Sequence, residues 1–214
     1  MLPAMTASAV LLLALTAVVA VLDWFAVATG RRSAEHVLKP LTMVGLVAVA
    51  LAMDSSDTGL RVVVIVALLL SLAGDVFLML PRDLFVPGLA SFLAAHVAYI
   101  IALFMVGALS GGFVVGLLGV AVAVALLGVR IVRGARAQDP ALVAPVMAYL
   151  VVISLMVASA AGTGHWLALL GALLFYVSDA VLGWTRFVAD FVNSRVVVMV
   201  TYHLGQALLV LGIL

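Results

Sequence analysis

The sequence contains no cysteine and very little charge. The absence of cysteine excludes disulfide bonds, thiolate catalysis, and zinc or iron–sulfur sites that use cysteine ligands. Only 9% of the 214 residues are charged and 68% are hydrophobic, whereas a soluble domain carries about 25% charged residues. A soluble monomer of this size could not bury so much apolar surface. The composition therefore excludes that class and predicts an integral membrane protein.

Basic residues are also missing where a secretion signal or a nucleic-acid surface would need them. No lysine or arginine precedes Arg31, and the first apolar run is longer than the core of a signal peptide. We therefore expect this run to stay in the protein as its first membrane span. The net charge is only +1 and no basic cluster is present, which argues against nucleic acid as a partner and leaves the lipid bilayer.

Eight apolar stretches of near-bilayer length are separated by breaks that are charged or rich in glycine and proline. They lack the two-residue alternation of barrel strands, so they predict an all-α integral membrane protein with eight transmembrane helices in one domain over residues 1–214. The predicted spans are 4–28, 38–53, 61–80, 84–106, 112–132, 141–161, 165–184 and 195–213.

Lysine and arginine are distributed unevenly among the predicted loops. Nine of the ten lie in the odd-numbered loops or at the span ends beside them, and only Arg61 lies in an even-numbered loop. Because short cytoplasmic loops are enriched in basic residues, this bias predicts cytoplasmic odd-numbered loops and both termini outside the cytoplasm. The membrane expected is a bacterial-type inner or plasma membrane.

A weak internal repeat relates the two halves of the chain. Asp75 in the third predicted span recurs as Asp179 in the seventh, and Tyr99 in the fourth recurs as Tyr202 in the eighth, at offsets of 104 and 103 residues. An offset of four spans preserves orientation, so the pattern predicts two parallel four-helix repeats. The alternative is chance matching in a sequence dominated by a few apolar residue types.

Ionisable side chains inside the spans are the candidates for function, because charge is costly within a bilayer. Asp75 and Asp179 each lie five residues from the cytoplasmic end of their predicted span, about 8 Å along a helix. Uncharged residues would join helices without this cost, so we favour a functional role for both aspartates. His96 and His203 fit either a functional or a structural role. Close helix packing is expected at Gly74, Gly171, Gly183 and Gly205.

The segments around these positions resemble the lysoplasmalogenase family of eight-span membrane proteins, also called YhhN-like. The resemblance extends from about residue 38 to residue 214 and rests on five segments in order. They are Lys39-Pro-Leu-Thr42, Ser71-Leu-Ala-Gly-Asp75, Gly88-Leu-Ala-Ser-Phe92 with His96 and Tyr99, Phe175-Tyr-Val-Ser-Asp179, and Thr201-Tyr202 with Gln206. The resemblance implies hydrolysis of the vinyl ether bond of lysoplasmalogens, which needs neither a cofactor nor a metal. The products would be a fatty aldehyde and glycerophosphoethanolamine or glycerophosphocholine.

This chemistry requires a proton donor and a carboxylate that orients water. We hypothesise that Asp75 and Asp179 are this catalytic pair, without assigning the acid and the base. Lys39 and Asn193 are expected to bind the phosphate of the lysophospholipid substrate. Orientation of water or of the ether oxygen is expected of His96, Tyr99, Tyr202 and Gln206.

Other functions stay open at this stage. A pair of intramembrane aspartates would also serve as a proton relay in a transporter of small solutes or lipids. A metal-dependent lipid hydrolase would hold zinc through His96, His203, Asp75 and Asp179, although no HExxH spacing is present. A purely structural membrane protein is the remaining alternative. His36 and His165 are expected in solvated loops.

Overall fold

The computed structural model describes residues 5–214, which form helices joined by short loops, with no strand among them. Residue 4, the first of the predicted span 4–28, lies outside the described residues. The helices are α1 (Ala7–Ala28), α2 (Arg32–Ala52), α3 (Thr58–Met79), α4 (Phe85–Met105), α5 (Gly111–Ala123), α6 (Val129–Gln138), α7 (Val143–Thr163), α8 (Trp166–Phe187) and α9 (Ser194–Ile213). A π-helical turn (Val124–Gly128) joins α5 to α6, and a 3₁₀ turn (Pro140–Leu142) precedes α7.

Eight helical segments within residues 5–214 are long and apolar enough to cross a membrane. The fifth segment combines α5, the π-helical turn and α6, and the sixth combines the 3₁₀ turn with α7. This arrangement confirms the predicted all-α membrane fold.

The second helix begins earlier than its predicted span, 38–53. α2 begins at Arg32, so Lys39 lies about two turns inside the helix and not at its start. His36 also lies on α2, although it was expected in a loop. Both expectations were wrong because they placed these charged residues at the start of the span or before it. In the structure Lys39 forms an ion pair with Asp75, which stabilises its charge inside the helix.

The fifth segment continues to Gln138, six residues beyond its predicted end at 132. This extension is amphipathic, which is why hydropathy alone did not find it. Ile131 and Ala135 are buried against the rest of the protein, and α6 packs on α7 and α8. The basic residues of α6 are exposed; they are Arg130, Arg133 and Arg136.

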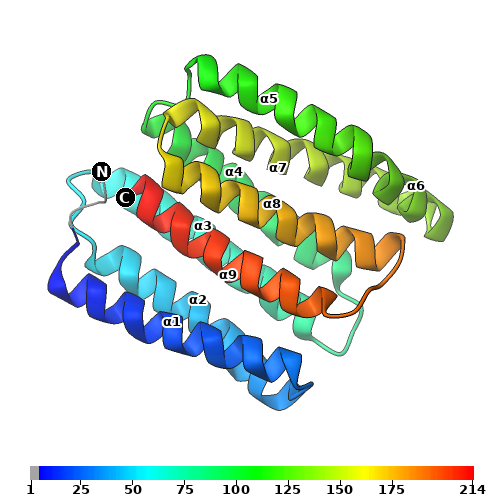
Figure 1. Cartoon of the computed structure of the whole chain (residues 1–214), viewed down its shortest axis with the longest axis horizontal. Coiled ribbons are helices and arrows are strands. Elements are labelled where there is room, and N and C mark those ends of the chain that lie inside the picture. The colour runs from blue at the N-terminus through cyan, green and yellow to red at the C-terminus, as the bar shows by residue number, and fades with distance from the viewer. Residues whose placement is uncertain (1–4) are drawn as a thin grey trace.

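The helices form a closed series in which α1, α2, α3, α4, α7, α8 and α9 each contact the next, and α9 returns to α1 (Figure 1). α9 also contacts α2 and α3. Half of the residues in its most apolar stretch are buried, whereas only 11% of those in the fifth segment are. α5 packs outside the series on α7. The odd-numbered loops lie together at one end of the bundle, and the C-terminus lies at the other end (Figure 1).

Two glycines bring α8 and α9 into close contact. A Cβ atom added at Gly171 would lie 2.7 Å from the backbone nitrogen of Leu209, and one added at Gly205 would lie 2.9 Å from that of Phe175. Backbone atoms cannot move aside as flexible side chains do, so small residues are required at this crossing. Gly183 differs, because the nearest atom to an added Cβ is a side-chain carbon of Ile131 at 3.4 Å.

We expect Gly171→Val to destabilise the protein by about 3 kcal/mol, the upper range for an overpacked core. The valine side chain would collide with the backbone of α9 and force the two helices apart. Thermal unfolding of the purified protein in detergent measures this effect. Gly119→Val on α5 is the matched control, because nothing lies within 4 Å of a Cβ built there. Equal melting temperatures for the two variants would contradict this account of the crossing.

Candidate active site

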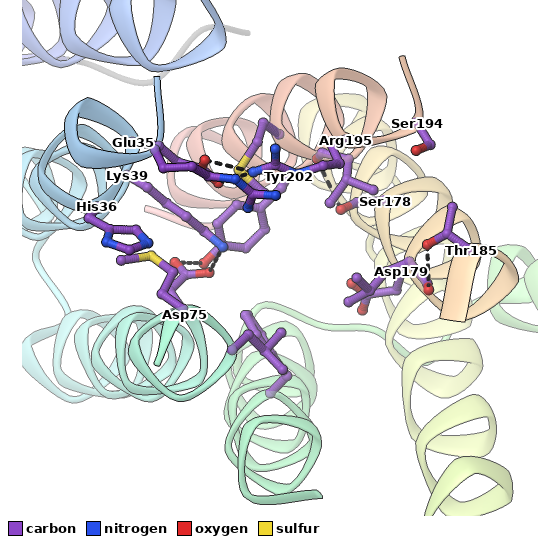
Figure 2. Close-up of a pocket in the computed structure, with 17 residues that line it drawn as sticks. Glu35, His36, Lys39, Asp75, Ser178, Asp179, Thr185, Ser194, Arg195 and Tyr202 are labelled. Atoms are coloured by element: carbon purple, nitrogen blue, oxygen red, sulfur yellow. Dashed lines mark hydrogen bonds and ion pairs between the residues drawn. The ribbon is translucent and has the colours of Figure 1, made fainter. Parts of the chain in front are cut away.

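A pocket of about 210 Å³ opens at the end of the bundle that carries the odd-numbered loops. It lies between the first turns of α2 and α9 and the last turns of α3 and α8, with Phe92 of α4 at its base. Its polar lining consists of Arg32, Glu35, His36, Lys39, Asp75, Ser178, Asp179, Thr185, Ser194, Arg195 and Tyr202. Asp75 and Asp179 face this pocket from different sides (Figure 2).

Asp75 is a buried carboxylate with a buried cation beside it. Lys39 Nζ lies 2.9 Å from Asp75 Oδ1, and only 7% and 1% of the two side chains are exposed. The hydroxyl of Tyr202 donates a hydrogen bond to the other oxygen, Oδ2, at 2.7 Å. The ammonium group of Lys39 also lies 5.8 Å from the centre of the Tyr202 ring, within the range of a cation–π contact. Three helices therefore hold Asp75 in one position, opposite a charge that balances its own.

Asp179 has different surroundings. Tyr149 donates a hydrogen bond to Asp179 Oδ2, and Nε2 of the fully buried His96 lies 3.6 Å from the same oxygen. No lysine or arginine forms an ion pair with Asp179 within residues 5–214. The His96 ring packs edge-on against Tyr149, with ring centres 5.2 Å apart. The two aspartates thus share a pocket, but of the two only Asp75 forms an ion pair with a lysine or arginine.

Tyr99 and Gln206 meet beneath the pocket and do not line it. The Tyr99 hydroxyl donates to Gln206 Oε1 at 2.5 Å, and both side chains are fully buried. This bond joins α4 to α9, the helices that carry His96 and Tyr202. Of the six predicted binding residues, only Lys39 and Tyr202 line the pocket, whereas His96, Tyr99 and Gln206 are fully buried outside its lining.

Asn193 and His203 also lie away from the pocket lining. Asn193 is exposed and adopts a left-handed conformation with φ of 64° just before α9, while the following Ser194 and Arg195 line the pocket. His203 Nδ1 accepts a hydrogen bond from Trp24 Nε1 at 3.1 Å, between α9 and α1.

The four residues of the zinc hypothesis do not come together. No group of three or more histidine, aspartate or glutamate side chains with metal-binding geometry occurs in the part of the chain that the structure describes. His96 approaches Asp179, whereas His203 is bonded to Trp24 and Asp75 to Lys39. Within residues 5–214 these four side chains therefore do not form the single group that this hypothesis requires.

Sequence reasoning missed an ion pair at the mouth of the pocket. Arg195 Nη2 lies 2.6 Å from both carboxylate oxygens of Glu35, which is 7% exposed. The two residues are 160 positions apart, so no local pattern relates them. Glu35 and Lys39 are four residues apart and share a helix face. This spacing would have been informative if the second helix had been extended to Arg32.

Outside the spans, Asp83 links the loop before α4 to the end of α8. Arg186 Nη2 donates to Asp83 Oδ2 at 2.7 Å, and this bond, with the charge of Arg186, holds the pKa of Asp83 below its usual value. The lowered pKa means that the pair stabilises the fold at neutral pH, and that this contribution is lost only as the pH falls through the pKa of Asp83 in the folded protein. The Arg186 guanidinium also lies 5.0 Å from the centre of the Phe85 ring.

Together these features define an eight-span helical membrane protein with two buried carboxylates facing one pocket. The model of the YhhN family matches residues 34–213. The chain belongs to the YhhN family. This finding confirms the resemblance inferred from the motifs.

The chain is also similar to curated relatives named lysoplasmalogenase TMEM86B. It is 32% identical to the protein from Homo sapiens over 151 residues, which cover 69% of this chain and 62% of the relative. The relative from Mus musculus shows the same identity and coverage, and the one from Sus scrofa matches over 150 residues. The chain thus spans less than two thirds of the length of these relatives. No solved structure matches it.

Proposed function

We propose that this protein is a membrane hydrolase that cleaves the vinyl ether bond of lysoplasmalogens. The products are a fatty aldehyde and glycerophosphoethanolamine or glycerophosphocholine. The observation that carries the proposal is the pocket in which Asp75 is paired with Lys39 and Asp179 has no such cation. The names of the relatives, which state lysoplasmalogenase, support the same activity.

Vinyl ether hydrolysis needs a proton donor and an anion at one site. A proton adds to the β-carbon of the vinyl ether, and the α-carbon and ether oxygen become an oxocarbenium ion. Water then adds to the α-carbon and loses a proton, which gives a hemiacetal. The hemiacetal hydroxyl then loses its proton as the aldehyde carbonyl forms, and the bond to the glycerol oxygen breaks while that oxygen takes up a proton. No covalent intermediate on the enzyme is required.

The different surroundings of the two aspartates support an assignment of these roles. Asp179 has no cation to stabilise a negative charge, and a buried carboxyl group without one favours its protonated form. We assign Asp179 as the acid that protonates the β-carbon. Asp75 faces the ammonium group of Lys39 at 2.9 Å, so we assign it as the carboxylate that stabilises the cation and takes the proton from water.

Neighbouring side chains then have positioning or binding roles. Tyr202 holds Asp75 and Tyr149 holds Asp179 through hydrogen bonds, while Nε2 of His96 lies 3.6 Å from Asp179 Oδ2. Tyr99 and Gln206 fix α4 against α9 beneath them. Asn193 does not line the pocket, so we no longer propose it as a contact for the phosphate of the substrate. Lys39 does line the pocket and remains a proposed phosphate contact, together with residues at the pocket mouth. Those residues at the mouth are Arg32, His36 and Arg195.

The pocket is proposed to open toward the cytoplasm. It lies at the end of the bundle that carries the odd-numbered loops, where nine of the ten lysine and arginine residues are found on or beside the loops. The positive-inside rule assigns that end to the cytoplasmic side and both termini to the other side. A bacterial-type inner or plasma membrane fits this orientation.

The proposal predicts aldehyde release from a vinyl ether lysolipid and from no close analogue. Purified protein is offered a lysoplasmenyl-ethanolamine, the saturated alkyl ether of the same chain length, and the acyl ester. The saturated ether has no β-carbon double bond to protonate, so we expect it to stay intact. Mass spectrometry of the products measures each reaction, with and without a chelator. Fatty acid release from the ester, or proton-coupled flux in liposomes without cleavage, would overturn the proposal.

A further inference from the structure

A second, apolar chamber adjoins the polar pocket at Asp179. It has a volume of about 40 Å³ and lies between α4, α6, α7 and α8. Its apolar walls include Leu89, Ile131, Val146, Leu150 and Phe187. Four residues line both spaces; they are Leu78, Phe92, Asp179 and Leu182. Asp179 therefore stands at the boundary between a charged cavity and an apolar one.

We infer that this apolar chamber, here called the chain chamber, binds the first carbons of the single hydrocarbon chain of a lysolipid. The inference rests on the proposed function and extends it by fixing how the substrate lies. A single-chain amphiphile matches the two spaces, since its charged headgroup fits the polar pocket and its chain fits the apolar one. The bond between those two parts, the vinyl ether, would then lie beside Asp179.

The walls of the chain chamber support this occupant. Apart from Asp179, the only polar side chain that lines it is Tyr149, whose hydroxyl is bonded to Asp179. Phe85 and Phe187 close it at the end near the odd-numbered loops, with ring centres 5.5 Å apart in an edge-on contact. A cavity needs about 10–15 Å³ to hold one water molecule, so a space of about 40 Å³ is narrow. It therefore accepts the start of one chain and excludes a second chain beside it.

Gly183 leaves the room for this chain. It lies four residues after Asp179 on α8, and hence on the same face of the helix. The nearest contact of an added Cβ is the side chain of Ile131 at 3.4 Å, which is ordinary packing. Gly183 is therefore not required for close helix approach, and a larger side chain at this position would enter the chain chamber.

The test uses a lysolipid that the enzyme cannot cleave, so that binding is measured separately from hydrolysis. The probe is a saturated alkyl-ether lysophosphatidylethanolamine with a photoreactive diazirine near the ether end of its chain. In the parent protein we expect crosslinks on Ile131, Val146 and Leu150, located by mass spectrometry. In Gly183→Leu we expect crosslinking to fall by about tenfold or more, the effect of filling an apolar pocket.

Gly119→Leu is the matched control, because it makes the same change at an open position on α5 and should label as the parent does. Melting temperatures in detergent verify that both variants fold. Crosslinks spread over exposed lipid-facing residues of the parent, or undiminished chamber labelling in a folded Gly183→Leu, would overturn the inference. If Gly183→Leu does not fold, the labelling map of the parent still decides between these results. Chamber labelling in a protein that releases no aldehyde would uphold the chain chamber while refuting the proposed hydrolysis.

Discussion

Replacement of Asp179 by asparagine is expected to lower the rate of aldehyde release by about 10²–10⁴-fold, the usual contribution of general acid catalysis. Asparagine keeps the shape of the side chain and can still accept the hydrogen bond from Tyr149, but it has no proton to transfer to carbon. We expect Asp75→Asn to lower the rate within the same range, because the site would lose its anion. Single-turnover assays with a lysoplasmenyl lipid measure both effects.

Asp54→Asn is the matched control for these two variants. Asp54 is exposed between α2 and α3, at the end of the bundle away from the pocket, so this change should leave the rate unaltered. The carboxylate mechanism fails if both pocket variants release aldehyde at the parent rate. If only Asp75→Asn is slow, Asp179 has neither catalytic role and the two-carboxylate mechanism is wrong.

The sequence was sufficient for the fold class because bilayer-length apolar runs are visible in the local sequence and need no tertiary contact to be recognised. It was misleading at the first turns of α2, where the hydropathy of the segment falls although the helix continues. There Glu35 and Lys39 are stabilised by Arg195 and Asp75, which lie far away in the chain. Such contacts exist only after folding, so no local pattern predicts them.

The candidate site was predictable to the extent that charge inside a span is conspicuous. Asp75 and Asp179 were chosen for that reason, and the structure brings both to one pocket. Tyr149 was harder to find, because a tyrosine in an apolar helix usually joins helices, and its bond to Asp179 is also a contact between helices. Each aspartate accepts a bond from a tyrosine on another helix, Tyr202 or Tyr149. These two tyrosines are not equivalent in the predicted repeat, which pairs Tyr202 with Tyr99, and Tyr99 bonds to Gln206 instead of Asp179. The two-repeat architecture therefore stays a prediction.

Lys39→Met is expected to destabilise the protein by about 3–5 kcal/mol, the cost of leaving a buried charge without its partner. Methionine preserves most of the volume of the lysine stem, so the loss comes from the charge and not from a cavity. Asp75 would then bind a proton to remain buried, and aldehyde release should fall because the site would no longer hold a carboxylate. Thermal unfolding in detergent and the aldehyde assay measure the two effects on the same sample.

The double variant Lys39→Met/Asp75→Asn distinguishes the loss of the whole ion pair from the loss of one of its charges. With both charges removed, no buried charge is left without a partner, and the amide oxygen of the introduced side chain still accepts the bond from Tyr202. Most of the lost stability should therefore return, whereas activity should not, because the carboxylate is still absent. Arg32→Met is the matched control for stability, as Arg32 is exposed at the pocket mouth and forms no ion pair within residues 5–214. If the two charges are coupled, removing both restores stability relative to removing one. A double variant less stable than Lys39→Met would therefore contradict the ion pair as the reason that Lys39 is buried.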